Sequence, residues 1–184
     1  RELNKKIKSH QEWLKDINEG ERLVLNGYNL SSLNLVGVNL KYAEFSGSDL
    51  SYTSFFNSDL KYADLGNANL FSADLENVNL EVAYLHNSNL SYANLDNATL
   101  INSNMSDSNL SHTIFRRANL LRANLNNCKL DNTKLSQANT NQVYGLDIYS
   151  IDNIGTFNGK VTYIPSLDRV FAGCWKGSLD EFLN

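Results

Sequence analysis

The chain has 184 residues, about the length of one domain, with 16 basic and 20 acidic side chains and a formal net charge of −4. This acidic balance argues against direct binding of nucleic acid, and no segment has the roughly 20 apolar residues that cross a membrane. The sequence starts without an apolar signal segment, so we expect a cytoplasmic protein. Two cysteines and three histidines supply neither a disulfide framework nor a zinc-ligand set, and we expect no cofactor or metal.

The first expected element is an amphipathic helix over residues 2–19, followed by Gly20 at the position of a C-terminal cap. Its apolar positions follow a heptad-like spacing: Leu3, Ile7, His10, Leu14 and Ile17. Residues 1–20 are therefore predicted to cap the region that follows.

From Leu25 to Leu135 the sequence repeats with a period of five. The 23 positions at this spacing hold 19 Leu, three Phe and one Met, and the residue two positions earlier is small in every unit from Val38 to Ala138. Asp or Asn stands directly before the Leu in most units. This period fits neither a helix of 3.6 residues per turn nor a strand whose faces alternate every two residues.

Within each unit the two inward positions are separated by two residues and then by three, which predicts one short extended side followed by a corner. Four such units would close a coil of 20 residues, and coils stacked about 4.8 Å apart would pair their backbone groups. We therefore expect an all-β solenoid over residues 21–140. Its bore is predicted to be filled by the repeated Leu, including Leu65, Leu70, Leu75 and Leu80. In the first coil, larger residues replace the small ones and are expected to meet Trp13 and the helix: Leu23, Tyr28 and Leu33.

On these repeats the chain resembles the pentapeptide-repeat proteins, and the resemblance implies a right-handed quadrilateral β-helix. The flanking segments His10–Leu14, Tyr163–Pro165 and Gly173–Gly177 look like the ends of small bacterial and phage members of the family. The family also implies one known activity, since acidic members mimic duplex DNA and bind DNA gyrase.

Charge counts speak against a strong DNA mimic. Residues 21–140 hold eleven acidic and eight basic side chains, a net charge of −3, whereas duplex DNA of the same length, about 28 Å, would carry about 16 negative charges. The acidic residues lie toward the N-terminal half, and the five-residue register has no loop insertion.

The two residues after each Leu are not needed in the core, and stacking of the coils aligns them in vertical ladders on the surface. One ladder holds Tyr42, Tyr62, Val82, Asn102 and Arg122, and another holds Tyr52, Ser72, Tyr92 and His112. Two interpretations stay open, aromatic stacking that stiffens the solenoid and a strip that binds a partner. The candidate partner surface comprises Tyr42, Tyr52, Tyr62, Asp59, Asp64 and Asp74.

Residues 141–184 have a different character. A hairpin is predicted at Asn158-Gly159 before a strand at 160–164, with a further strand at 169–172 and a short helix after the capping-box pattern at 178–181. This unit carries more aromatic residues than one bore requires, so we expect a homodimer through them, with an internal core as the competing interpretation. The candidate dimer surface comprises Tyr163, Phe171, Trp175 and Phe182.

No convergent set of catalytic groups is evident. His86 and His112 fall on different sides of the predicted coil, Cys128 occupies an inward small position, and Cys174 has no motif-linked histidine. The sequence therefore predicts a non-catalytic scaffold that presents side-chain ladders to another protein. The alternative is a DNA-mimic modulator of DNA gyrase or topoisomerase.

Overall fold

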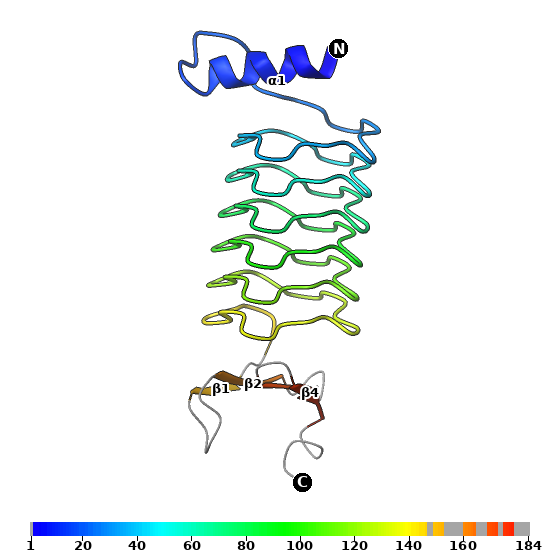
Figure 1. The fold of residues 1–184 in the computed structure, drawn as a ribbon, viewed down its shortest axis with the longest axis vertical. Helices are drawn as coiled ribbons and strands as arrows, with labels where there is room; N and C mark the ends of the chain where they lie inside the picture. Colours follow the sequence, from blue (N-terminus) through cyan, green and yellow to red (C-terminus); the bar gives the residue numbers. More distant parts are fainter. Residues whose placement is uncertain (1, 147–148, 153–159, 165–168, 173–174, 179–184) are drawn as a thin grey trace.

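The computed structural model is a tower of stacked coils with a helix at one end and a small sheet at the other (Figure 1). The structure describes residues 2–146, 149–152, 160–164, 169–172 and 175–178. Parallel bridges join residues 20 apart, beginning with Val24 to Glu44 and ending with Asn124 to Tyr144. Each coil therefore has 20 residues on four five-residue sides, which agrees with the β-solenoid predicted from the period.

In the unit from Leu60 to Asp64 every backbone N–H finds an acceptor. Leu60 and Tyr62 donate to the coil below, to the carbonyls of Asn79 (2.7 Å) and Glu81 (3.1 Å), while Asp64 donates to Ala43 in the coil above (2.9 Å). Ala63 donates back to Leu60 across the corner (3.0 Å). The remaining N–H, that of Lys61, donates to Oδ1 of Asp59 (3.1 Å). Asp or Asn before the Leu thus supplies an acceptor that the main chain does not, although Ile114, Lys129 and Lys134 hold the same position in regular coils, so the repeat tolerates other residues there.

The corners are tight turns whose third residue is left-handed. From Gly27 to Gln142, every position of this kind has a φ between 53° and 73°, and most of these residues are not glycine. Such a φ suits Asn, and it explains why Asn recurs there as at Asn67 and Asn77. Val82 is the one β-branched residue among them.

The bore is packed as a single apolar column. Leu65, Leu70, Leu75 and Leu80 are all 0 % exposed. Where Ser or Thr takes the small position, its hydroxyl is also satisfied, since Thr53 Oγ1 donates to the carbonyl of Leu30 (2.7 Å) and Thr113 Oγ1 to that of Leu90 (2.8 Å). These hydroxyls add hydrogen bonds between coils without widening the bore.

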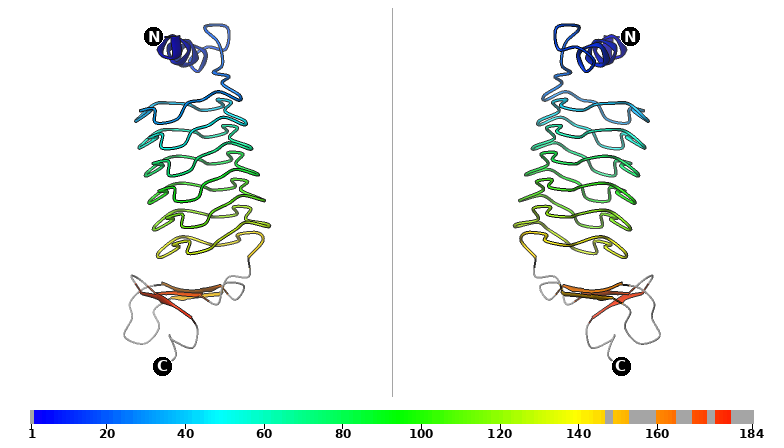
Figure 2. Two further views of the ribbon diagram at one scale, coloured as in Figure 1. Left: turned by 90° about the vertical axis from the view of Figure 1, so that its right-hand side faces the viewer. Right: turned by 90° about the vertical axis from the view of Figure 1, so that its left-hand side faces the viewer.

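Helix α1, Glu2–Trp13, lies across the first coil (Figure 2). Leu3 and Ile7 pack against the core of the bore. The prediction that the helix continues to residue 19 is wrong, and Ile17 is 72 % exposed. Asp16 Oδ1 accepts a hydrogen bond from the N–H of Asn18 (3.0 Å), a local turn that competes with further helix. Gly20 (φ 69°) does not cap the helix. It lies against the backbone of the helix, where a Cβ would collide with the carbonyl oxygen of Ser9.

His10 anchors this helix to the first coil. Its side chain is 0 % exposed, Nδ1 accepts a hydrogen bond from the N–H of Leu23 (3.1 Å), and the ring stacks on Trp13 at 5.7 Å. Nε2 is buried and has no hydrogen-bond partner among the described residues. Burial lowers the pKa of His10, the charge of Arg22 lowers it further, and only the backbone of Lys41 acts in the opposite direction.

The prediction for the first coil is correct in part. Leu23 is buried and Leu33 packs against the core, but Tyr28 is 51 % exposed and points away from the bore. Its ring lies 5.7 Å from Lys6 Nζ of the helix. Trp13 instead contacts Tyr42, edge to face at 6.2 Å.

Four antiparallel strands follow the last coil, in the order β1-β2-β3-β4. They are β1 Tyr149–Asp152, β2 Lys160–Ile164, β3 Arg169–Ala172 and β4 Trp175–Gly177. β2 and β3 coincide with the two strands expected from the sequence, and the sheet lies across the end of the tower (Figure 2). The expected Asn158-Gly159 turn and the expected final helix beyond Ser178 lie outside the described residues.

Candidate functional site

The three tyrosines of the expected partner surface lie on two different corners. Tyr42 and Tyr62 stack at 4.9 Å with nearly parallel rings (9°) on one corner, which also includes residues 81–82, 101–102 and 121–122 and is called the Tyr42 corner. Tyr52 lies half a coil away, on the diagonally opposite corner. A partner that contacts one corner through a flat surface therefore cannot contact the other.

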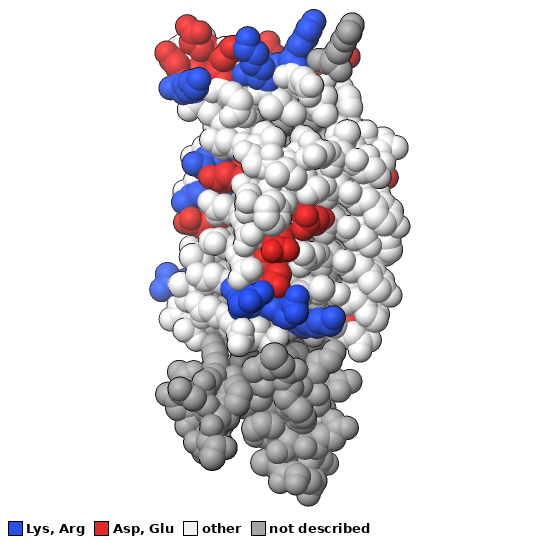
Figure 3. Space-filling view, viewed as in Figure 1, with Lys and Arg blue, Asp and Glu red and all other residues white. Residues whose placement is uncertain are grey.

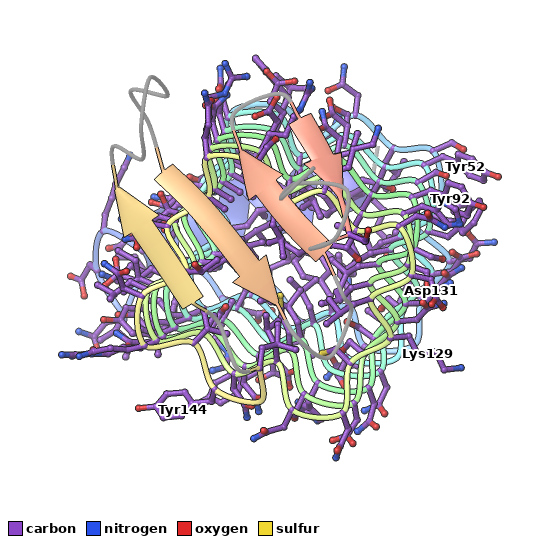
Figure 4. All side chains as sticks on the ribbon, turned by 90° about the horizontal axis from the view of Figure 1, so that it is seen from below. Tyr52, Tyr92, Lys129, Asp131 and Tyr144 are labelled. Carbon is purple, nitrogen blue, oxygen red and sulfur yellow. The ribbon has the colours of Figure 1, made fainter. Side chains whose placement is uncertain are left out.

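The corner of Tyr52 carries a continuous aromatic column. This surface, the Tyr52 corner, comprises residues 51–52, 71–72, 91–92 and 111–112. Phe71 lies edge to face between two tyrosines, 5.5 Å from Tyr52 and 5.6 Å from Tyr92, and Tyr92 stacks on His112 at 4.5 Å (7°). Tyr52 is 60 % and Tyr92 54 % exposed. Seen along the tower, both side chains point outward in the same direction (Figure 4).

Sequence reasoning missed Phe71 because it followed only one residue of each turn. The left-handed residues of this corner form one ladder, in which Ser72 leaves a gap between Tyr52 and Tyr92. Phe71, which directly precedes Ser72, fills that gap with its ring. The sequence does distinguish this turn. On the Tyr52 corner, only the turn at 71–72 has an aromatic residue in its first position, whereas the other three turns begin with Ser. Both aromatic columns thus join neighbouring coils through ring contacts, and the Tyr52 corner also leaves Tyr52 and Tyr92 open to solvent.

The three aspartates of the expected partner surface do not form one strip. Asp59, Asp64 and Asp74 belong to three different bridge ladders, so they lie on three sides of the tower. Each is partly buried, and each Oδ1 accepts the N–H two residues later, as in Asp64 with Gly66 at 2.9 Å. Asp59 also pairs with Lys41 (3.2 Å). These carboxylates are therefore already engaged in hydrogen bonds to their own turns.

Other charges along the tower are paired between coils. Asp96, 5 % exposed, accepts hydrogen bonds from Arg116 (3.1 Å) and from both Nε (3.3 Å) and Nη2 (2.9 Å) of Arg117. The hydrogen bonds and charge of Asp96 raise the pKa of Arg117. Lys61 donates to Glu81 at 2.8 Å. Figure 3 shows acidic atoms directly above basic ones near the middle of the tower, with further charged side chains along its left-hand edge.

Groups with catalytic chemistry are dispersed. His86 lies over Gly66, His112 lies on the Tyr52 corner, and His10 is enclosed beneath the helix. Cys128 is half-buried with Sγ 2.9 Å from the carbonyl of Met105, and burial raises the pKa of its thiol to about 11. In the described part of the chain, no three His, Cys, Asp or Glu side chains are grouped to hold a metal ion. Cys174 lies outside the described residues.

The sheet register separates the residues of the expected dimer surface. Tyr163 pairs with Val170, and Ala172 pairs with Trp175, so Tyr163 and Trp175 fall in the same alternating set of positions. Phe171 falls in the other set, and Phe182 lies outside the described residues. The backbone register therefore places Tyr163 and Trp175, but not Phe171, in one alternating set.

Comparison with known proteins identifies the repeat. A family model described as pentapeptide repeats matches the chain in eight copies, over residues 24–55, 48–81, 63–102, 79–117 and 103–139. Among curated proteins, none matches the sequence. None of the helices in the described residues is both long and apolar enough to cross a bilayer.

Solved structures of similar proteins share the architecture. A pentapeptide repeat protein, Rfr23, from the cyanobacterium Cyanothece 51142 is 27 % identical over 70 % of this chain and 98 % of its own, with a TM-score of 0.53. QnrB1, a plasmid-mediated fluoroquinolone resistance protein, is 20 % identical over 70 % of this chain and 69 % of its own, with a TM-score of 0.58, and shows the fold alone. A pentapeptide repeat protein of the Arabidopsis thaliana thylakoid lumen is 28 % identical over 50 % and 68 %, with a TM-score of 0.45.

Proposed function

The chain belongs to the pentapeptide-repeat family, and from this premise we propose that it is a non-catalytic scaffold that binds another protein through the Tyr52 corner. The observation that carries the proposal is the exposure of Tyr52 and Tyr92, 60 % and 54 %, on a column that Phe71 holds in place. Rings fixed by their neighbours lose little conformational entropy when a partner covers them.

The composition of this corner supports protein binding. Its eight residues are aromatic, Ser or His, and none is Lys, Arg, Asp or Glu. Interface centres are enriched in aromatic residues and depleted of charge, and Tyr with Ser is the combination used by antibody binding loops. The Tyr42 corner is less suitable, because Lys61 lies 5.1 Å from the ring of Tyr62 and Trp13 of the capping helix packs on Tyr42.

The alternative, a DNA-mimic modulator of DNA gyrase or topoisomerase, has less support. A mimic needs acidic groups aligned on the face that meets the enzyme. Asp59, Asp64 and Asp74 are instead distributed over three sides and bonded to their own turns.

Further parts of this proposal come from the sequence and the family. We propose a cytoplasmic bacterial protein with a right-handed coil and a homodimer formed through the C-terminal unit. The dimer is supported by the composition of this unit, which carries more aromatic residues than one bore requires, among them Tyr163, Phe171, Trp175 and Phe182.

Site-specific photo-crosslinking tests the scaffold proposal. Benzoylphenylalanine placed at Tyr92 is expected to capture one defined partner in cells, whereas the same group at Tyr84, 51 % exposed on another side, is not. The capture should be lost when Tyr52 is changed to Ser, a residue that the same ladder already holds at Ser32 and Ser72 with positive φ. Equal capture from both positions would contradict the assignment of the binding surface.

A further inference from the structure

The first coil ends in an open sheet edge, because in the described part of the chain no coil lies above it (Figure 1). Lower in the tower each side pairs with the side above. Ser54 donates its N–H to the carbonyl of Leu33 (2.9 Å), and its own carbonyl accepts the N–H of Leu35 (2.8 Å). The equivalent N–H and carbonyl of Asn34 have no hydrogen-bond partner among the described residues. Such an edge is a template on which another extended chain can pair.

Helix α1 satisfies other parts of this end but not the side of Asn34. Gln11 Nε2 donates to the carbonyl of Asn39 (2.6 Å), and His10 Nδ1 accepts the N–H of Leu23 (3.1 Å). Both contacts come from the C-terminal half of the helix and are made to two other sides of the coil. The backbone edge at Asn34 is therefore left free beside the helix.

A groove of about 450 Å³ lies between α1 and this side of the first coil. Its apolar lining comes from Leu3 and Ile7 of the helix and from Leu33, Leu35 and Val38 of the coil, and Asn34 lies among them. Pockets that hold ligands measure about 300 to 1,000 Å³. An apolar hollow of sufficient size thus adjoins the unpaired N–H and carbonyl of Asn34.

The opposite side of the helix has a groove of different chemistry. Beside Val24 its lining is mainly charged, with contributions from Lys5, Lys6, Glu21 and Arg22. Charged groups lose their hydration when an apolar segment covers them, which disfavours such an occupant. The groove at Asn34 has one charged residue in its lining, Lys8, which is exposed and lies 3.9 Å from Glu12 of its own helix. Of the two grooves, the one at Asn34 is therefore suited to an apolar segment.

The pairing of the lower coils defines the occupant that fits this edge. In a parallel bridge, the residue opposite Asn34 has its preceding carbonyl accept the N–H of Asn34 and its following N–H donate to the carbonyl of Asn34, as Asn34 and Ser54 show one coil lower. The residues before and after it then face inward, as Leu33 and Leu35 do on either side of Asn34. The edge and the groove together specify an extended segment with an apolar residue on each side of a central one.

We propose that the groove between α1 and the side of Asn34 binds an extended segment of a partner protein, which pairs with Asn34 as an added parallel strand and buries two apolar side chains. Main-chain hydrogen bonds supply affinity in this mode of recognition, and the pockets for alternate side chains supply specificity. The site does not use the Tyr52 corner, so it goes beyond the scaffold function proposed above.

A pair of peptides tests the main-chain hydrogen bonds. Fluorescein-labelled Ser-Leu-Thr-Leu-Ser has the required alternation, and its anisotropy should show saturable binding with a dissociation constant below about 1 mM. The same peptide with a methyl group on the amide nitrogen of its second leucine cannot donate to the carbonyl of Asn34 and should bind at least about ten-fold more weakly. At saturating unmethylated peptide, hydrogen exchange of the Asn34 amide should slow at least about ten-fold.

Proline at position 34 tests the edge itself, because it removes the unpaired N–H. Asn34→Pro should weaken peptide binding at least about ten-fold, whereas Asn34→Ala loses only the side-chain acceptor for the N–H of Val36 and should change it less than about two-fold. Val24→Pro makes the same backbone change on the charged side of the helix and, as the matched control, should also stay within about two-fold. Urea unfolding shows whether each variant is folded.

Unchanged binding by a folded Asn34→Pro variant, equal affinity of the two peptides, or no saturation at about 1 mM would overturn the proposal. If Asn34→Pro does not fold, the two peptides and the exchange rate of the Asn34 amide carry the test with the native chain. Photo-capture at position 92 should not respond to Asn34→Ala or to the peptide. Loss of peptide binding with continued capture would therefore leave the scaffold function standing, and the reverse result would leave this site standing.

Discussion

The left-handed residue of each corner makes a testable contribution to stability, and Asn77 is the best position to measure it. Its φ is 56°, its side chain is exposed, and its N–H donates to the carbonyl of Asp96 in the coil below (3.0 Å). A left-handed conformation costs an L-residue about 1 to 2 kcal/mol, less for Asn and most for a β-branched side chain. The substitution therefore acts through the backbone and leaves the packed core untouched.

Asn77→Val is expected to destabilise the protein by about 1 to 2 kcal/mol, whereas Asn77→Gly should stay within about 0.5 kcal/mol because conformational relief offsets added chain entropy. For a chain of this length the Val variant should melt about 2 to 8 °C lower. Urea unfolding at constant m-value measures the difference, with Ser106→Val as the control at a corner position that is not left-handed. Equal midpoints for the Gly and Val variants would refute the assigned role of the turn.

Four further predictions concern the core, the cap, the acidic residues and assembly. Leu75→Ala should cost about 2 to 5 kcal/mol by urea unfolding, against under about 0.5 for Ser106→Ala, because Leu75 is fully buried. The lowered pKa of His10 means that acid protonates it in the unfolded chain first, so stability should fall as the pH drops below 6.5, and His10→Gln should flatten this part of a pH–stability curve. Purified gyrase should keep its supercoiling activity at low micromolar protein; inhibition that disappears when the three aspartates become Asn would contradict this. Sedimentation should show a dimer that dissociates on Trp175→Ala, and a species of 20.7 kDa at tens of micromolar native protein would exclude it.

The repeat predicted most of the tower because one physical rule acts at every unit. A Leu every five residues cannot share a face in any helix or strand, so the coil and its buried column followed from spacing alone. The strands 160–164 and 169–172 were also predicted from the sequence, because they are rich in β-branched and aromatic residues. Where tertiary contacts decide, the sequence was less informative. The helix was expected to reach residue 19, but it ends at Trp13, and the hydrogen bond from the N–H of Asn18 to Asp16 Oδ1 forms a turn just beyond it.

The structure adds to the candidate site the arrangement of its residues, which the sequence did not show. The tyrosines were recognised as ladder residues, yet assigning Tyr42 and Tyr52 to one surface ignored the half coil between them. The aspartates were interpreted as partner contacts because their charge was visible in the sequence and their hydrogen bonds were not. Oδ1 of Asp59 is committed to the N–H of Lys61, and Asn performs the same task at Asn69 with Phe71 (3.3 Å). The charge at these positions is therefore incidental to the turn.

The five positions of a unit have different structural roles, and these roles determine which positions can form a binding surface. Two of five positions fill the bore, and the position before the Leu most often holds an Asp or Asn that accepts a turn N–H, so the two turn residues are the ones with most freedom to vary. The second of these must accept a left-handed φ, as Tyr52 and Tyr92 do. A ring at that position projects from a corner and is repeated at multiples of the coil spacing. Because the two aromatic columns lie on opposite corners, one can hold the capping helix through Trp13 and Tyr42 while the other remains open to a partner.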